Sequence, residues 1–157
     1  MRILGIETSC DETAASVVED GYRMLSNVVA SSMDEHVKYG GVVPEIAARS
    51  HIEVIMPVID QALAEAECSW EDIDAIAVTY GAGLGGSLLV GVMTARTLAI
   101  AHDKPLYAIN HVEAHVYANF IRETSLPGYS LRKSSPAFPM LGIIVSGGHS
   151  QLVLFKN

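Results

Sequence analysis

Residues 110–120, NHVEAHVYANF, place two histidines four positions apart. Residues at positions i and i+4 lie on the same face of an α-helix, so the imidazoles of His111 and His115 can point toward one ion. A closed metal site usually needs three or four protein ligands, and the sequence offers no obvious third ligand near this pair. Taken alone, the pair fits either part of a metal site or the polar side of an ordinary helix.

The same segment argues against a metalloprotease. In proteases with the H-E-x-x-H motif, the general base directly follows the first histidine. Here Val112 occupies that position and Glu113 comes one residue later. At 3.6 residues per turn, Glu113 is rotated by about 200° from His111 and faces away from any shared ion. Peptide hydrolysis is therefore the least favoured interpretation.

A glycine-rich segment, GAGLGG at residues 81–86, matches the dinucleotide-binding pattern G-x-G-x-x-G. That motif belongs to the first strand-to-helix turn of its fold and is followed by an acidic residue at the end of the next strand. Here three predicted strands and a helix precede the glycines, and no acidic residue stands at the expected distance. The segment is better interpreted as a tight helix entry with close backbone packing.

Two polar turns are better candidates for a phosphate or cation site. The turn VSGGHS, beginning at Val145, offers glycine N–H groups and serine hydroxyls that can approach an anion. The turn ETSCDET carries the carboxylates of Glu7, Asp11 and Glu12, which repel a bare phosphate but can hold a cation or order water. Cys10, in the same turn, is expected to be a packed thiol rather than a nucleophile. Each turn alone also fits ordinary turn chemistry.

The pattern of apolar residues predicts the elements that must position these groups. The order βββαβαβα predicts one mixed sheet with helices packed on it, which is the order of a ribonuclease-H-like domain of the α/β class. Strands are predicted at 2–7, 13–19, 22–32, 73–80 and 105–109, and helices at 44–67, 86–102 and 111–123.

A proline- and serine-rich stretch near residues 124–139 divides the chain. We expect a first lobe at 1–125, a connection at 126–139 and a β-hairpin at 140–157. The hairpin MLGIIVSGGHSQLVLF repeats the plan of ILGIETSCDETAASVV near the start of the chain, although repeats this short also arise by chance. The matching positions are Leu4, Gly5, Ile6, Ser9 and Thr13 with Leu141, Gly142, Ile143, Ser146 and Ser150.

Composition narrows the class of protein. Of 157 residues half are hydrophobic, and 10 basic against 18 acidic side chains give a formal charge of −8, which repels a nucleic-acid backbone. The one basic concentration, Arg122 with Arg132 and Lys133, fits a solvated loop when taken alone. Two cysteines make no disulfide framework, and no leader or membrane-spanning stretch is evident. We expect a soluble protein of the cytoplasm with no membrane partner.

Five ordered motifs resemble one family, the tRNA adenosine threonylcarbamoyltransferases of the TsaD type, formerly called O-sialoglycoprotein endopeptidases. They are GIETSCDETAASVV, GGVVPEIAARSHIEVIMPVI, AVTYGAGLGGSLLVGVMTARTLA, NHVEAHVYANF and VSGGHSQLVL. The resemblance implies the actin, heat-shock protein and sugar-kinase (ASKHA) architecture, in which two ribonuclease-H-like lobes enclose a nucleotide cleft. The chain would then hold the first lobe and the initial hairpin of a truncated second lobe.

The family implies transfer of a threonylcarbamoyl group from threonylcarbamoyl-AMP to N6 of the adenosine beside the anticodon, with release of AMP. It implies one divalent metal per subunit, iron or zinc, with His111 and His115 as two of its ligands, and an adenylate nucleotide (threonylcarbamoyl-AMP, ATP or AMP) in the cleft. No residue can be assigned as the general base. The implied nucleotide contacts are Val145, Ser146, Gly147, Gly148 and His149, and the first hairpin lining the cleft comprises Ser9, Asp11 and Glu12.

The sequence also departs from the family. It has GAG where members usually have GPG, and Thr94-Ala95-Arg96 where they have Ala-Lys. The family's third metal ligand, an aspartate, would lie beyond Asn157, so we expect the isolated chain to be inactive. The implied partners are tRNA, a TsaB-like paralogue and the ATPase subunit of the complex, and a second copy of the fragment, forming a homodimer, is a further candidate partner. The alternative is a non-catalytic dimerisation module of the same fold.

Overall fold

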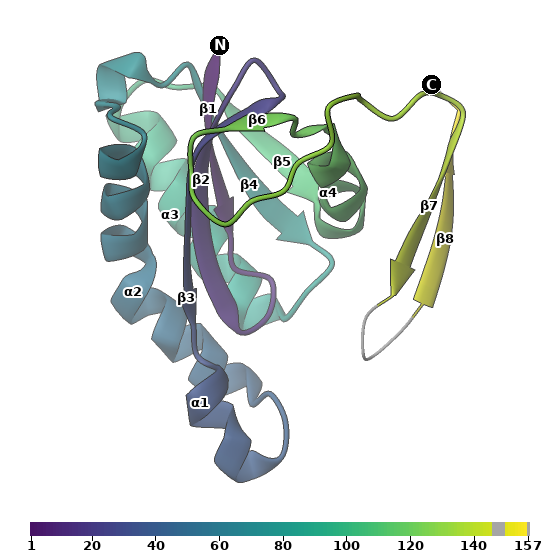
Figure 1. Cartoon of the computed structure of the whole chain (residues 1–157). Helices are drawn as coiled ribbons and strands as arrows, with labels where there is room; N and C mark the ends of the chain where they lie inside the picture. The colour runs from purple at the N-terminus through teal and green to yellow at the C-terminus, as the bar shows by residue number, and fades with distance from the viewer. Residues whose placement is uncertain (146–149, 157) are drawn as a thin grey trace.

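The computed structural model describes residues 1–145 and 150–156. Its larger sheet has six strands in the order β5-β4-β1-β2-β3-β6 (Figure 1). β1, β2 and β3 form an antiparallel meander, whereas β4 runs parallel to β1, and β5 parallel to β4. The strands are β1 Arg2–Glu7, β2 Glu12–Glu19, β3 Arg23–Ser31, β4 Ala75–Gly81, β5 Leu106–Asn110 and β6 Glu123–Thr124.

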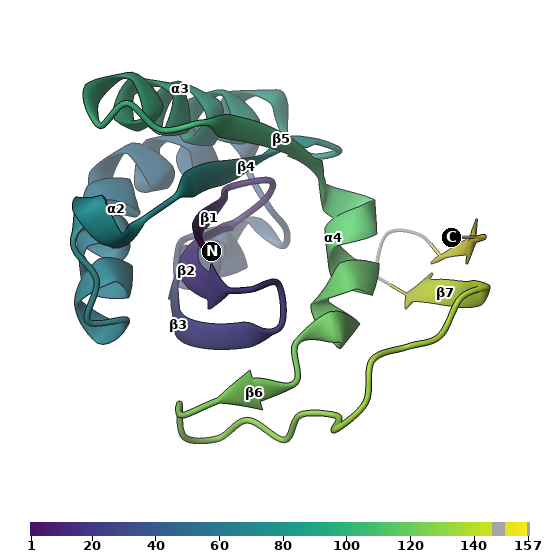
Figure 2. The same cartoon turned by 90° about the horizontal axis from the view of Figure 1, so that it is seen from above.

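Helices cover both faces of this sheet. Figure 2 shows α2 and α3 on one face and α4 on the other. α2 starts with Pro44, a residue suited to the first helical turn, and continues through Pro57 without ending there. The helices are α1 Met33–His36, α2 Pro44–Glu65, α3 Gly85–Ala101 and α4 His111–Tyr117, with short 3₁₀ turns η1 Val37–Tyr39, η2 Trp70–Asp72 and η3 Ala118–Phe120.

The main core lies between the sheet and the α2–α3 pair. Successive side chains of a strand point to opposite faces, so Leu4 and Ile6 point to the same side, and both are buried. They join Ile55 and Ile59 of α2 and Ile76 of β4 in one apolar cluster. The cluster fixes β1 and β4 against the helices, and thereby fixes where these strands end.

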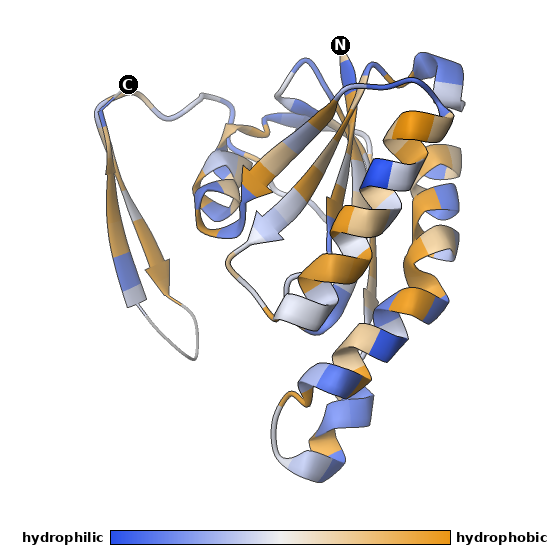
Figure 3. Cartoon of the chain, turned by 180° about the vertical axis from the view of Figure 1, so that it is seen from behind, coloured by the Kyte–Doolittle hydropathy of each residue, from blue (hydrophilic) through white to orange (hydrophobic). Residues whose placement is uncertain are grey.

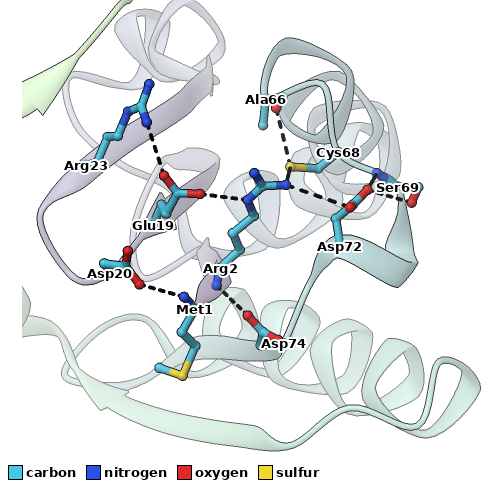
Figure 4. A network of polar contacts seen from close by, with 10 residues as sticks. All are labelled: Met1, Arg2, Glu19, Asp20, Arg23, Ala66, Cys68, Ser69, Asp72 and Asp74. Atoms are coloured by element: carbon cyan, nitrogen blue, oxygen red, sulfur yellow. Dashed lines mark hydrogen bonds and ion pairs between the residues drawn. The ribbon is translucent and has the colours of Figure 1, made fainter.

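A polar network fixes the opposite end of β1 (Figure 4). The Arg2 guanidinium donates from Nε to Glu19 at 2.9 Å, and the Arg2 backbone N–H donates to the Asp74 carboxylate at 2.6 Å. The amino group of Met1 pairs with Asp20 at 2.6 Å. These contacts are partly exposed, so we assign them a role in the alignment of β1 with its neighbours rather than a large stabilising energy.

A second sheet is formed by the hairpin of β7 Met140–Val145 and β8 Ser150–Phe155. This hairpin packs against α4, the helix on one face of the six-stranded sheet. Gly142 lies against Val116, and the rings of Tyr117 and Phe155 meet with their centroids 5.7 Å apart.

The predicted strands and helices are present, and the expected mixed α/β class is confirmed. The predicted helix at 111–123 was too long, because α4 ends at Tyr117. The side chain of Asn119 donates to the carbonyl oxygens of His115 and Val116, and the chain then turns through η3 into the short strand β6. The polar loop after β3 contains the unpredicted helix α1.

The domain limits at 125/126 and 139/140 stay a prediction. Within residues 1–145 and 150–156, no helix combines the length and the apolar character that a membrane span requires.

Candidate functional site

Three parallel strands end side by side at one edge of the sheet. Ile6 of β1 is paired with Val78 of β4, and Thr79 of β4 with Ile109 of β5. Glu7, Thr79 and Asn110 therefore come together at the carboxyl ends of the strands, where ligands of open α/β sheets usually bind.

Asn110 also starts α4. Its side-chain oxygen accepts the backbone N–H groups of Val112 at 2.9 Å and Glu113 at 3.3 Å, which is the capping arrangement that asparagine favours. His111 is consequently the first residue of α4 and projects at the edge of the sheet.

The structure brings the two histidines together. The Nε2 atoms of His111 and His115 are 3.1 Å apart, and their rings are nearly perpendicular, at 86°. His111 is partly buried and His115 is exposed. The imidazoles thus converge from one helical turn, in the arrangement that the spacing predicted, whereas Glu113 is exposed to solvent.

A carboxylate lies behind His111. Oε2 of Glu7 is 3.3 Å from Nδ1 of His111 and accepts the hydroxyl of Thr79, while Oε1 accepts the backbone N–H of Ser9. The Ser9 hydroxyl also lies 3.1 Å from the same Nδ1. Partial burial alone would raise the pKa of Glu7, but the hydrogen bonds from Ser9, Thr79 and His111 outweigh it and hold the pKa below its ordinary value. Glu7 is therefore ionised at neutral pH.

Buried side chains from two helices hold the turn between β1 and β2. Nε2 of His51 donates to the carbonyl oxygen of Cys10 at 3.1 Å, and the Ser87 hydroxyl donates to the same oxygen at 3.3 Å. The Thr13 hydroxyl is 2.7 Å from Nδ1 of His51. Burial lowers the pKa of His51, so the imidazole is neutral when it makes these contacts. The turn is therefore attached to α2 and α3.

The glycine-rich segment packs directly on this turn. The backbone N–H of Leu84 donates to the carbonyl oxygen of Ser9 at 2.7 Å. A Cβ atom on Gly83 would lie 2.5 Å from that oxygen, and one on Gly91, which follows the segment within α3, would lie 2.3 Å from the side-chain hydroxyl of Thr8. The close backbone packing predicted for the segment is present.

The other predicted residues lie at different places around the turn. The carbonyl oxygen of Asp11 accepts both the N–H and the hydroxyl of Ser32, at 3.0 and 2.7 Å, and Glu12 is exposed at the start of β2. The described contacts of His111 come from Glu7, Ser9 and His115, and neither Asp11 nor Glu12 takes part in them.

The prediction of a packed thiol at Cys10 is wrong, because this residue is exposed. Partial desolvation and the neighbouring Asp11 raise the pKa of the Cys10 thiol. The thiol is therefore protonated at neutral pH, which disfavours a nucleophilic role.

The histidine pair lies between two hollows. One, of about 480 Å³, is formed by the sheet and α4 and includes Glu7, Thr79 and both histidines in its lining. The other, of about 540 Å³, lies between α4 and β7 and is lined by His115 and Val145 among others. Val145 is thus near the pair, whereas the predicted contacts Ser146, Gly147, Gly148 and His149 lie outside the described residues.

The part of the chain that the structure describes contains no cluster of three or more His, Cys, Asp or Glu residues arranged to hold a metal. The predicted ligand pair is therefore at most part of a metal site within these residues.

The sequence interpretation assigned no role to Thr79 and Asn110, and it considered Glu7 only as a carboxylate that could hold a cation or order water, not as a partner of His111. A signal was present, since each stands at the end of a predicted parallel strand, and such ends share one edge of the sheet.

Comparisons with known proteins support the same family as the motifs. Residues 23–157 match the family described as tRNA N6-adenosine threonylcarbamoyltransferase. A protein of that name from Thermomicrobium roseum is 55% identical over all of this chain, and one from Protochlamydia amoebophila is 53% identical. The chain covers 42% and 43% of these two proteins, so it spans less than half their length.

Among solved structures, YeaZ from Pseudomonas aeruginosa has a TM-score of 0.52 and 20% identity, over 70% of this chain and 45% of that one. At this identity the likeness bears on the fold, and it agrees with the ribonuclease-H-like lobe of the ASKHA architecture. Because the family match covers most of the chain and the identities exceed half, the chain belongs to the tRNA N6-adenosine threonylcarbamoyltransferase (TsaD) family.

Proposed function

We propose that this chain forms the first lobe, and part of the active site, of an enzyme that modifies tRNA. The enzyme transfers the threonylcarbamoyl group from threonylcarbamoyl-AMP to N6 of the adenosine beside the anticodon, giving t6A and releasing AMP. The observation that carries the proposal is the convergence of His111 and His115 beside the first hairpin turn, in a chain of this family. The isolated chain is proposed to be inactive.

The distance between the imidazole nitrogens fits two ligands of one divalent ion. With metal–nitrogen bonds of about 2.0–2.1 Å, two ligating nitrogens lie about 2.9 Å apart when the nitrogen–metal–nitrogen angle is a right angle, and about 3.4 Å apart when it is tetrahedral. The observed separation of the Nε2 atoms is 3.1 Å. We propose one iron or zinc ion per subunit at this point, with further ligands outside the described residues.

The chemistry requires help because the exocyclic amine of adenine is a weak nucleophile. When bound, the metal supplies a Lewis acid that stabilises charge developing on the carbamoyl oxygen. His111 and His115 would hold this ion, and backbone N–H groups of the VSGGHS turn would offer hydrogen bonds to the adenylate. The proposed nucleotide-contacting residues are Val145, Ser146, Gly147, Gly148 and His149, with Ser9, Asp11 and Glu12 in the first hairpin turn.

We also propose tRNA, a TsaB-like paralogue and an ATPase subunit as partners. Figure 3 shows hydrophobic residues along both α2 and α3, the two helices on the outer face of the sheet. Among the large apolar side chains of these helices, Ile52 on α2 is 65% exposed and Leu89 on α3 is 61% exposed. This outer surface of α2 and α3 would suit a paralogue of the same fold. It also favours the second candidate function, a non-catalytic dimerisation module, but such a module has no need for a converging histidine pair.

The experiment compares t6A formation by the full-length protein with that of its His111→Ala and His115→Ala variants. We expect both variants to lose activity by more than about tenfold, because each lacks a metal ligand. His102→Ala is the matched control, since His102 stacks on Trp70, with ring centroids 4.0 Å apart, and contacts neither site histidine. Full activity in both site variants would contradict the proposal, whereas t6A formation by the full-length protein with the site histidines intact would exclude the non-catalytic module.

A further inference from the structure

Glu7 is a partly buried carboxylate that makes no ion pair with Lys or Arg among the described residues. Its hydrogen bonds come from the Thr79 hydroxyl, the Ser9 backbone and His111. The first two hold the plane of the carboxylate and leave Oε2 directed at Nδ1 of His111. Glu7 thus stands on the opposite side of the His111 ring from His115.

The direction of the contact with His111 follows from the chemistry of the two groups. An ionised carboxylate can only accept hydrogen bonds, so Nδ1 of His111 must carry the hydrogen. In the neutral ring the lone pair then lies on Nε2, the atom that faces His115 at 3.1 Å. A ligating histidine in metal sites commonly donates its other N–H to a carboxylate in this way.

Ser9 contacts the same nitrogen but cannot impose the same choice. Its hydroxyl lies 3.1 Å from Nδ1 and can either donate or accept a hydrogen bond. The hydroxyl is therefore compatible with both tautomers of His111, whereas the carboxylate is compatible with one.

We propose that Glu7 is a positioning residue, which fixes the Nδ1–H tautomer and the ring orientation of His111 so that its Nε2 lone pair is available beside His115. The value of this arrangement for metal binding rests on the proposed function, but the tautomer itself is a property of the metal-free chain.

Glu7→Gln is the sharpest test because it preserves shape. The amide presents one oxygen and one NH₂ group, while the native carboxylate accepts hydrogen bonds at both positions. If the amide oxygen of the Glu7→Gln side chain faces Ser9, its NH₂ group lies next to Nδ1 of His111. Because NH₂ donates hydrogen bonds, this orientation favours the Nε2–H tautomer of His111. If the amide oxygen instead faces His111, the NH₂ group faces the backbone N–H of Ser9, and two hydrogen-bond donors oppose each other. We expect a substantial shift of His111 toward Nε2–H.

The measurement is a long-range ¹H–¹⁵N correlation spectrum of the full chain labelled with [¹⁵N]histidine, at about pH 8.5, where imidazoles in general are neutral. His111 should show the Nδ1–H pattern in the native chain and lose it in Glu7→Gln. Glu113→Gln is the matched control, since it removes the same charge from an exposed position two residues from His111. An unchanged His111 pattern in Glu7→Gln, or an equal change in both variants, would overturn the proposal.

A second variant keeps the test decisive if Glu7→Gln does not fold. Ser9→Ala removes the competing hydroxyl but leaves the backbone N–H that Glu7 accepts. His111 should keep the Nδ1–H pattern in this variant. Its loss would show that Ser9, not Glu7, selects the tautomer, and would refute the proposal.

Zinc titration of the same chains separates this inference from the proposed function. We expect affinity to fall by about 10- to 100-fold in Glu7→Gln and to stay unchanged in Glu113→Gln. If the His111→Ala, His115→Ala double variant binds zinc as well as the native chain does, the proposed metal site fails even where the tautomer result stands. If the double variant loses binding but Glu7→Gln keeps both affinity and tautomer, only the role of Glu7 fails.

Discussion

The two hairpins of the molecule share a sequence plan but differ in burial. Leu4 and Ile6 in β1 are 0% and 3% exposed, whereas the corresponding Leu141 and Ile143 in β7 are 59% and 67% exposed. Both hairpins are antiparallel with regular pairing. The local pattern therefore specifies strand and register, and the layer packed against a strand decides how much each side chain contributes to stability.

Different contacts hold the two hairpins in place in the molecule. The first is a central part of a six-stranded sheet, and α2 and α3 hold its turn through His51 and Ser87. The second is a two-stranded sheet that rests on α4 at Gly142. An isolated hairpin is marginally stable in water, so the second depends on this contact.

The largest expected effect is the difference between Leu4→Ala and Leu141→Ala. The first removes a fully buried side chain and should lower the free energy of unfolding by about 2–5 kcal/mol. The second acts on an exposed side chain and should change it by no more than about 0.5 kcal/mol. Urea unfolding followed by circular dichroism measures both, and equal losses would show that the hairpins are packed alike.

The next effect concerns the turn of the first hairpin. His51→Ala leaves the Cys10 carbonyl and the Thr13 hydroxyl without their imidazole partner, and should destabilise the fold by about 2–4 kcal/mol. Ser87 still donates to Cys10, so Ser87→Ala should cost less than His51→Ala. A larger loss in Ser87→Ala would mean that α3, not α2, provides the main attachment of the turn.

The pH dependence of stability should also trace to this buried imidazole. Burial lowers the pKa of His51 in the folded state, so the unfolded chain binds its proton more readily. The unfolding free energy should therefore fall as pH decreases from about 6.5, the ordinary histidine value, toward the lower pKa of the folded state. Unfolding measured across this range should give a shallower slope in His51→Ala, and identical slopes would contradict the assignment.

The smallest expected effect is a glycine substitution that should destabilise the second hairpin more than the first. A Cβ atom at position 142 would lie 2.8 Å from a methyl group of Val116, whereas one at position 5 would lie 3.4 Å from the nearest atom. Gly142→Ala should cost about 1 kcal/mol through displacement of the hairpin from α4, and Gly5→Ala should be nearly neutral. Hydrogen exchange of the β7 and β8 amides would detect the displacement, and unchanged protection in Gly142→Ala would rule it out.

Much of this fold could be predicted from sequence because its signals are local. The alternation in β1 and the apolar period of α2 identify the elements, and Pro44 marks the start of the helix. The early end of α4 was missed because it depends on the side chain of Asn119 bonding back to two carbonyl groups. Helix α1 is only four residues long, which is too short for a periodic pattern to appear.

The candidate site was predictable where its residues belong to one helix and not where they come from several strands. His111 and His115 are four residues apart, so helical geometry alone places them together. Glu7 and Thr79 are 72 positions apart in the chain, and their contact depends on how β1 pairs with β4. One sequence gives no direct measure of that pairing.

The glycines that lie against the first turn have a consequence for how this protein can vary. Ser9 stays beside the imidazole of His111 while position 83 presents only a hydrogen atom to the Ser9 backbone and position 91 presents only a hydrogen atom to the Thr8 side chain. The shape of the turn beside His111 therefore depends on two positions that carry no side chain. A substitution at either position would displace the turn and so change the surroundings of His111, although neither glycine contributes a reactive group.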